Sequence, residues 1–466
     1  MFQKIDVRAG FEERPVMEQS PAAPREVTVN EAMAIAIRCQ KNGQLAEAEA
    51  LYRKVLELKP DQPDALHYSG VLAHQHGRSE EAIALIARSL DLAPDQPDWH
   101  SNLGIIFQDR GKLQEAVVAY RRALALQPTH ANAHNNIGVL LRAQGMTVEA
   151  EEAYRTAIHL SPNQPDAYHN LAILLSATHR THEAVTCYCK ALTLKPQYPE
   201  ARRLLSLAYC VIGQPDKAVI VCEEWLKSEP DDPVARHTLA AVSGHDVPTR
   251  ASDAYVQKTF DSFAASFEAK LAQLHYQAPA LVAAALADAG LPAARALDVL
   301  DAGCGTGLCG ALVAPYARRL VGVDLSEGML EHAREKNVYD ELVRGELTAY
   351  LQDRHDAFDL IVTADTLVYF GALEDVAVAV AGALRSGGRL IFTVEEATED
   401  DAPSTYCIKP HGRFNHRAQY VERVLADAGL KTNIARAELR VESGLPVAGL
   451  VVTATKPATP IGATQV

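Results

Sequence analysis

A spacing of 34 residues runs through the first half of the chain. It is kept by a glycine, an alanine and a proline, and each has a physical role in a helical hairpin. Glycine ends a helix, alanine lets two helices pack closely, and proline stops the chain from continuing as helix. The three series are Gly43, Gly77, Gly111, Gly145 and Gly213; Ala48, Ala82, Ala116, Ala150, Ala184 and Ala218; and Pro60, Pro94, Pro128, Pro162, Pro196 and Pro230. The period therefore predicts a stack of helical hairpins, with His179 in place of one glycine.

This pattern is similar to the tetratricopeptide repeat, in about six copies over residues 29–240. The resemblance implies an all-α superhelix whose concave face is lined by the first helix of each pair. Four tyrosines at core spacing are expected to pack inside the hairpins: Tyr52, Tyr120, Tyr154 and Tyr188. Residues 1–28 lack this periodicity and are expected to form a mobile arm.

Asparagine recurs on the predicted concave face, where a partner would bind. Asn102, Asn136 and Asn170 are 34 residues apart. In some repeats of this family, notably those resembling the O-linked N-acetylglucosamine transferase, asparagines at this place grip the backbone of an extended peptide. An amide side chain donates and accepts at once, which suits a peptide group. The resemblance thus implies a protein or peptide partner, and the alternative is that these asparagines only bind water on the helix surface.

Histidines on the same first helices raise the question of a metal site. They lie on different repeats, roughly 10 Å apart in a stack of this kind, so we expect them to face solvent or line the groove. The four are His67, His100, His134 and His169. The eight cysteines include no Cys-x-x-Cys spacing, which favours free thiols, and no metal is expected.

A second informative stretch, residues 299–308, has the pattern of a buried strand that runs into a glycine-rich turn and a helix. Gly303, Gly305 and Gly307 let the backbone turn sharply and approach a nucleotide-like ligand. Asp324 ends another apolar strand about 20 residues later, where a carboxylate would bind a ribose. The nicotinamide and flavin spacing fails when read from Gly303 but is met from Gly305, so spacing alone leaves the ligand open.

Asp301 precedes the three glycines, and this combination resembles motif I of the class I S-adenosylmethionine-dependent methyltransferases. Strand and helix patterns then alternate as far as residue 456. The resemblance implies an α/β Rossmann-like domain over residues 255–457, with a seven-stranded sheet whose last strand is antiparallel. A linker is expected over residues 241–254 and a tail over residues 458–466. The whole chain resembles bacterial predicted methyltransferases that carry tetratricopeptide repeats, so a multidomain fold is expected.

The same resemblance assigns a site for S-adenosylmethionine residue by residue. The methionine part would lie on the glycine turn, the ribose on Asp324, and the adenine beside Leu325 and Met329. Glu346, after the third strand, fits the position that meets the adenine amino group; the alternative is a surface acid. The cofactor-binding candidates are Asp301, Gly303, Cys304, Gly305, Gly307, Asp324, Leu325, Met329 and Glu346.

A segment before the first strand, residues 255–274, carries apolar side chains at helical spacing. Its phenylalanines, Phe260, Phe263 and Phe267, stand in a string that resembles the N-terminal lid of many small-molecule methyltransferases. Such a lid would exclude water from the methyl donor. The alternative is that these aromatic residues only pack the helix on the core.

The acceptor would meet the donor near Asp365 and Tyr369, which follow the fourth strand. Methyltransferases that act on adenine or glutamine amino groups carry two prolines here; both are missing, which argues against nucleic-acid amino methylation. Between the fifth and sixth strands, His416 is the side chain best suited to take a proton near neutral pH, and a helix-start histidine is its alternative role. Arg413, close to it, would pair with a substrate carboxylate.

Charge and hydropathy exclude some function classes. The net charge is -14, spread over both halves without a basic cluster, unlike that of a nucleic-acid or anionic-membrane binder. No apolar stretch reaches membrane-spanning length, so we expect a cytoplasmic location. The predicted function is methyl transfer from S-adenosylmethionine to a small-molecule, carrier-bound or protein acceptor recruited by the repeats. The alternatives are a repeat scaffold with a cofactor-sensing or inactive methyltransferase domain and, more distantly, a nicotinamide oxidoreductase.

Overall fold

A computed structural model describes residues 4–6, 26–401, 405–442 and 444–458 of the chain. The chain divides into two units, residues 1–174 and residues 175–466. Within the described ranges, no helix has the length and the apolar composition needed to cross a membrane.

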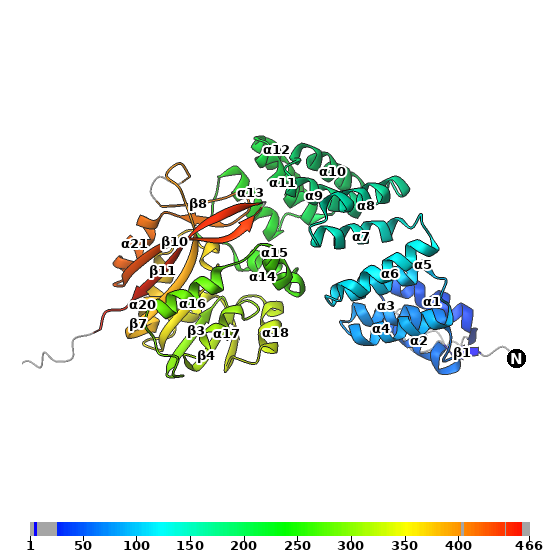
Figure 1. Ribbon diagram of the computed structural model, residues 1–466, viewed down its shortest axis with the longest axis horizontal. Coiled ribbons are helices and arrows are strands. Elements are labelled where there is room, and N and C mark those ends of the chain that lie inside the picture. The colour runs from blue at the N-terminus through cyan, green and yellow to red at the C-terminus, as the bar shows by residue number, and fades with distance from the viewer. Residues whose placement is uncertain (1–3, 7–25, 402–404, 443, 459–466) are drawn as a thin grey trace, which may run out of the picture. The chain divides into compact units, whose positions relative to one another are not determined.

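Paired helices make up the first unit, in blue to cyan in Figure 1. They are α1 (Val29–Lys41), α2 (Leu45–Leu58), α3 (Pro63–Gln75), α4 (Ser79–Leu92), α5 (Pro97–Asp109), α6 (Leu113–Leu126), α7 (Ala131–Ala143) and α8 (Thr147–Leu160). Helix α9 (Pro165–Ala177) follows and crosses the boundary between the units. The helical hairpins predicted from the 34-residue period are confirmed.

The repeated residues act as their chemistry predicts. The glycines of the series all have φ between 71° and 80°, and His179 takes the same left-handed conformation, with φ of 60°. The repeated alanines have no exposed surface, and Tyr52, Tyr120, Tyr154 and Tyr188 are almost completely buried. Because the same close contact is needed in every hairpin, the same small residue returns at every step, and the tyrosine returns in four of the six repeats.

The arm predicted over residues 1–28 lies mostly outside the described residues. Its two described ends, β1 (Lys4–Asp6) and β2 (Glu26–Thr28), pair as antiparallel strands. Val27 is buried in the apolar cluster of the first hairpin, and Thr28 caps α1 through a reciprocal pair of bonds with Glu31. These contacts give the second end of the arm a fixed place that its composition does not predict.

The second unit begins with the last repeat helices, which are α10 (Thr181–Leu194), α11 (Pro199–Val211) and α12 (Pro215–Ser228). A single helix, α13 (Pro233–Ser243), follows them and extends into the range predicted as linker. Cys222 replaces the core tyrosine in the sixth repeat, and Trp225 is fully buried beside it on the same helix. The large indole fills the space that a smaller side chain at residue 222 leaves.

A twisted sheet is the centre of the second unit (Figure 1). Its main strands are β3 (Leu297–Ala302), β4 (Ala317–Asp324), β5 (Glu341–Arg344), β6 (Phe358–Thr363), β7 (Leu384–Glu396), β10 (Lys431–Glu442) and β11 (Leu445–Thr455). They stand in the order β10-β11-β7-β6-β3-β4-β5, and β11 is antiparallel to both of its neighbours. The predicted seven-stranded arrangement with a reversed last strand is confirmed.

Two short strands were not predicted. β8 (Tyr406–Ile408) pairs with β9 (Phe414–His416), and β9 extends the end of β7. Strands of three residues are too short to show the alternation by which strands are predicted. The sheet therefore has nine strands, with two added at the edge where the sequence predicts an acceptor pocket.

Helices cover both faces of this sheet. α16 (Ala278–Asp288) and α17 (Leu308–Val313) pack on one face, and α19 (Leu347–Gln352), α20 (Glu374–Ala383) and α21 (Ala418–Asp427) pack on the other. α18 (Glu327–Glu335) follows β4. Because β3 to β7 are parallel, their carboxyl ends meet at one edge, where ligands bind in sheets of this kind.

The segment predicted as one helix over residues 255–274 has two helices. α14 (Asp253–Asp261) and α15 (Phe267–Gln273) are separated by a short 3₁₀ turn, η1 (Ala264–Ser266). The break places the phenylalanines of this segment on a bend instead of along one straight face.

Candidate active site

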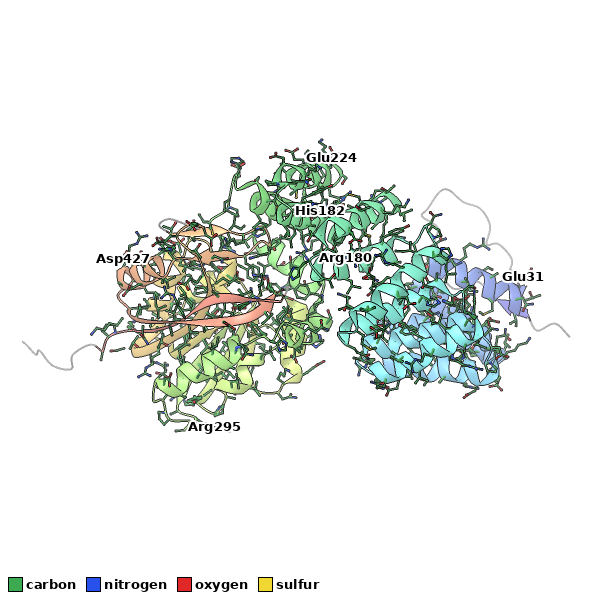
Figure 2. The ribbon with its side chains drawn as sticks, turned by 45° about the horizontal axis from the view of Figure 1, so that its top comes forward. Glu31, Arg180, His182, Glu224, Arg295 and Asp427 are labelled. Atoms are coloured by element: carbon green, nitrogen blue, oxygen red, sulfur yellow. The ribbon has the colours of Figure 1, made fainter. Side chains whose placement is uncertain are left out.

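A cavity of about 960 Å³ lies at the carboxyl edge of the sheet in the second unit. Its walls come from the glycine turn and strand ends, from α14 and α15, from the loop after β8, and from the last repeat helices. Figure 2 draws the side chains of these elements and labels Glu224, which lies on the solvent side of α12. Its neighbour Trp225 lines the cavity.

The glycines of the turn differ in how much free space surrounds the position of a Cβ atom. Gly303, Gly305 and Gly307 all have left-handed φ values, which suits residues without a Cβ. A Cβ on Gly303 would lie 2.1 Å from Oγ1 of Thr366, whereas one on Gly305 would meet only Phe267, at 4.0 Å. Gly303 is therefore needed for packing within the chain, and Gly305 presents its backbone to the cavity.

Asp324 joins the end of β4 to this turn. Its carboxylate accepts bonds from the backbone N–H of Gly305 and of Ser326, both at 2.9 Å. Burial raises the pKa of Asp324, although these bonds oppose the rise. Asp324, Leu325 and Met329 all line the cavity, as does Gly305. Each carboxylate oxygen keeps a second lone pair, so Asp324 can still accept a bond from a ligand hydroxyl.

Three predicted cofactor residues lie behind the cavity instead of on its wall: Asp301, Cys304 and Gly307. Asp301 is 1% exposed and accepts a bond from Oη of Tyr339 at 2.6 Å. Burial raises its pKa to about 7, and the charge of Asp324 adds to the rise. These residues shape the turn, and residues next to them that line the cavity would have to make the direct contacts with a ligand.

Glu346 lines the cavity and also begins α19. Its carboxylate accepts bonds from the backbone N–H of Thr348 and Ala349, at 3.0 and 2.8 Å. The helix cap fixes the side chain next to the adenine position that the motif implies. It is thus a structured acid and not a free surface one.

Asp261 and an ion pair between Glu268 and Lys336 both hold the lid segment against the rest of the domain. Asp261, at the end of α14, accepts bonds from Oγ of Ser326 and the backbone N–H of Gly328, at 2.5 and 3.2 Å. Phe260 and Phe267 line the cavity, with ring centroids 6.0 Å apart. The phenylalanines therefore pack on one another and line the cavity, and their role as a lid stays a prediction.

Asp365 and Tyr369 line the far end of the same cavity. Asp365 has φ of 52°, and its carboxylate accepts bonds from Oγ1 of Thr393 at 3.0 Å and from Arg440 at 2.7 Å. Burial raises the pKa of Asp365, while Arg440 acts to lower it. The ring of Tyr369 meets Phe260 edge to face at 5.4 Å. The two side chains lie where the sequence placed them, at the junction of the lid and the strand ends.

A buried charge network completes this end of the site. Arg440 is 4% exposed and bonds to Asp365, Glu395 and Glu442. Arg413 bonds to Glu395 at 2.5 Å and to Glu442 at 2.6 Å. The prediction that Arg413 pairs with a substrate carboxylate is therefore corrected, because the chain's own carboxylates already hold its guanidinium.

His416 does not line the cavity. It is fully buried in β9, its Nε2 lies 3.1 Å from the backbone oxygen of Gly371, and burial lowers its pKa to about 4. The predicted proton acceptor is thus a structural side chain, because β9 turns it into the core. His411 lines the cavity in its place. Its Nδ1 accepts from the backbone N–H of Arg413 at 3.3 Å, and burial lowers its pKa to about 4.

Residues of the last repeats form part of the cavity wall, which the sequence did not predict. Tyr198 and Arg203, from the turn before α11 and from α11 itself, line it. His237 on α13 has its Nε2 2.8 Å from the backbone oxygen of Gly412 and its ring stacked 3.9 Å from that of Tyr255. Within the second unit, the end of the repeat array is therefore joined to the loop that carries Arg413.

In the first unit, the asparagine series makes contacts between successive repeats. Nδ2 of Asn102 lies 3.0 Å from Nε2 of His67, and Nδ2 of Asn170 donates to Asn135 at 3.0 Å. Asn136 accepts a bond from its neighbour Asn135 at 3.2 Å. The bonds hold these amides in fixed orientations on the first helices.

The histidines of these helices differ from one another. His67 is 3% exposed and stacks on Trp99 at 4.7 Å, and burial lowers its pKa to about 4, so the expectation of a solvated ring is wrong for it. His100 and His134 each face the backbone oxygen of a proline, at 2.8 and 2.9 Å. Among the described residues, no group of three or more potential metal ligands comes together.

Family models match both parts of the chain. A model described as a methyltransferase domain matches residues 299–388, and three tetratricopeptide repeat models match residues 40–103, 102–165 and 153–186. The repeats and the methyltransferase domain are the two kinds of fold that the helices and the sheet display.

Curated proteins are similar to part of this chain. Trans-aconitate 2-methyltransferase of Paracidovorax citrulli (strain AAC00-1) is 31% identical over 120 residues, which are 25% of this chain and 46% of that protein. Methyltransferase-like protein 27 of Homo sapiens is 36% identical over 101 residues, 22% of this chain and 40% of that protein. The chain thus spans less than half the length of the curated relatives it matches.

Among solved structures, a putative S-adenosylmethionine dependent methyltransferase from Listeria monocytogenes is similar at 22% identity. The match covers 38% of this chain and 99% of that one, with a TM-score of 0.31.

Proposed function

We propose that this chain, which joins tetratricopeptide repeats to a methyltransferase domain, transfers the methyl group of S-adenosylmethionine to an acceptor bound in the cavity. One observation carries the proposal: a single cavity is lined both by Gly305 and Asp324 and by Asp365 and Tyr369. The first pair suits a nucleoside, and the second faces the place where an acceptor would enter.

The residues at the first end fit the cofactor. Asp324 has free lone pairs for ribose hydroxyls, and Leu325 and Met329 offer an apolar surface for the adenine. Glu346, fixed by its helix cap, is an acceptor for the adenine amino group. When bound, the cofactor supplies a methyl group on a sulfonium, which is already activated for displacement.

The chain's own residues have to orient the acceptor and exclude water. Phe260 and Phe267 cover the cavity, and Asp261 holds the segment that carries them against Ser326. Tyr369 and Asp365 border the acceptor and can donate to it or accept from it. In this proposal the carboxylate of Asp365, which accepts a bond from Arg440 at 2.7 Å, takes the acceptor proton.

The repeats have two roles in this proposal. Tyr198 and Arg203 line the acceptor end, so the last repeat takes part in acceptor recognition. The first unit would bind a protein or peptide partner on the first helices of its pairs, along the asparagine series Asn102, Asn136 and Asn170. Asn102 and Asn170 are already oriented by bonds to a neighbouring repeat, and Asn136 by a bond from Asn135, so a peptide would bind them without reordering.

Calorimetry with S-adenosylhomocysteine tests the cofactor site. We expect a Kd in the micromolar range for the full chain, typical of cofactor sites. Asp324→Asn should weaken binding by about 10- to 100-fold, because a charged acceptor is lost from a buried site. Asp375→Asn, an exposed change on α20, is the matched control and should leave the affinity unchanged.

Absence of binding by the wild type would reject the proposal, and equal affinity in Asp324→Asn would move the site. Titration with the nicotinamide dinucleotide in the same cell tests the competing ligand class. Tight binding of that dinucleotide without binding of S-adenosylhomocysteine would favour an oxidoreductase.

A further inference from the structure

The acceptor end of the cavity carries an excess of negative charge. Asp365 and Glu442 line it, and Glu395 lies directly behind them, 1% exposed. Only two guanidinium groups, of Arg413 and Arg440, bond to these three carboxylates. With all three carboxylates ionised, the network is therefore one positive charge short of neutrality.

Other ionised groups on the cavity wall do not neutralise this excess. Three cations are each paired with a carboxylate outside the network: Arg203 with Glu200 at 2.8 Å, Arg250 with Asp253 at 2.6 Å, and Lys258 with Asp232 at 2.6 Å.

The remaining cationic side chains on the wall are Lys195 and Lys270, and the wall also carries His411. Both lysines are exposed at the rim, where water screens their charge. His411 adds no charge near neutral pH, because burial lowers its pKa to about 4.

Aromatic rings surround the same carboxylates. Tyr255, Phe260, Tyr276 and Tyr369 all line the cavity. The Tyr369 ring centroid lies 5.4 Å from that of Phe260 and 6.5 Å from that of Tyr255. Ring faces attract a cation and remain favourable contacts for it when water is excluded. Buried carboxylates in excess, walled by aromatic rings, form an environment for a positively charged group.

We propose that the methyl acceptor of this chain is a protonatable amine, primary or secondary, that binds as an ammonium between the aromatic wall and the charge network. This inference rests on the proposed methyl transfer. A carboxylate acceptor is disfavoured, because Arg413 is already bonded to Glu395 and Glu442, and the network would repel a further negative charge.

The reaction balances with groups already named. The bound ammonium first gives one proton to a carboxylate of the wall, a role that we assign to Asp365. The nitrogen lone pair then forms the N–C bond as the C–S bond of the donor breaks, and the electron pair of that bond stays on sulfur. The products are the methylated ammonium and S-adenosylhomocysteine.

A pair of probes with one ring and opposite charges tests the inference in the full chain. The protein is first saturated with S-adenosylhomocysteine, and benzylamine and benzoate are then titrated by calorimetry. One excess charge in a partly desolvated site should favour benzylamine by about tenfold or more. Equal affinities, or tighter binding of benzoate, would overturn the proposal.

The variant Glu442→Gln tests whether the charge network causes the preference for benzylamine. It removes one carboxylate charge from the cavity wall, so the preference for benzylamine should fall by about tenfold. The matched control is Glu399→Gln, which removes the same charge from an 85% exposed side chain outside the cavity and should change nothing. An unchanged preference in Glu442→Gln would refute the role of the network.

Saturation with S-adenosylhomocysteine distinguishes failure of the proposed methyl transfer from failure of the amine inference. Failure of the wild type to bind S-adenosylhomocysteine contradicts the proposed function itself. Normal binding of that ligand with the wrong charge preference contradicts only the amine inference. If Glu442→Gln does not fold, Asp365→Asn replaces it, because asparagine tolerates the left-handed φ of 52° at this residue.

Discussion

Replacing Arg440 with methionine is the most direct test of the buried charge network. The change keeps much of the side-chain volume but removes the cation that bonds to Asp365, Glu395 and Glu442. Glu395 is 1% exposed and would keep only Arg413 as an ion-pair partner at bonding distance. Breaking one partner of a buried ion pair costs about 3–5 kcal/mol, because the charges left behind are poorly solvated.

The same strand offers a matched control. Arg436, four residues earlier on β10, bonds to Glu396, but its side chain is 74% exposed. Water screens such a pair, so Arg436→Met should lower the free energy of unfolding by about 1 kcal/mol or less. The two variants make the same chemical change on one strand and differ in burial.

The measurement has to report on the sheet. The chain has two tryptophans, Trp99 and Trp225, and both lie on repeat helices, so intrinsic fluorescence would miss the strands. Hydrogen exchange of the β7 and β10 amides, followed by mass spectrometry, gives the local free energy of opening without assuming a two-state chain. Equal losses in Arg440→Met and Arg436→Met would refute the assignment of a stabilising role to the network.

Three further predictions concern the turn and the repeats. Gly303→Ala should lower the free energy of unfolding by about 1–3 kcal/mol, because its Cβ would meet Thr366 and its φ is 70°. Adding Thr366→Ala should restore part of this loss. Gly43→Ala, which has open space around its Cβ, should lower it by only about 1 kcal/mol in thermal scans. The pKa of Asp301 is raised to about 7 in the folded chain, so the stability of the wild type should fall as pH rises from about 4 to about 7. Denaturant titrations across that range should show this fall in the wild type and should not show it in Asp301→Asn. Changing Asn102, Asn136 and Asn170 together to alanine should abolish capture of peptide partners and leave binding of S-adenosylhomocysteine intact. Retained capture would reject the peptide groove.

Local and periodic features of the fold could be predicted from the sequence. The hairpins repeat one set of contacts, so Ala48 predicts its equivalent in every later copy, and Tyr52 predicts Tyr120, Tyr154 and Tyr188. Asp324 could be placed because it ends a strand, and the carboxyl ends of parallel strands share one edge of the sheet. These inferences depend only on neighbours in sequence and on the geometry of regular elements.

Features that depend on distant contacts or on irregular backbone could not be predicted. Asp301 lies behind the cavity wall, where it accepts a bond from Tyr339, a residue 38 positions away with no motif around it. Arg440 follows the buried Leu439 and is buried too, because the register of β10 against β11 shifts at a bulge beside them. Strict alternation would have put one of these two side chains in solvent. A buried arginine is visible only once that bulge is known.

His416 and His411 illustrate the same limit within one loop. Both lie in a short stretch where the sequence predicts an acceptor pocket, and imidazole chemistry alone favours neither. The three-residue strand β9 turns His416 into the core, and the loop before it leaves His411 on the cavity wall. Such a short strand carries no periodic signal, so the choice between the two histidines needed coordinates.

The hydrogen bond between His237 and Gly412 has a consequence for engineering. A designer who wished to graft another recognition array onto this domain could not cut the chain at the apparent boundary after the repeats. Tyr198, Arg203 and His237 would leave with the discarded part, and the pocket would lose one side. A workable chimera has to keep the native chain from about Lys195 onward and exchange only the hairpins before it.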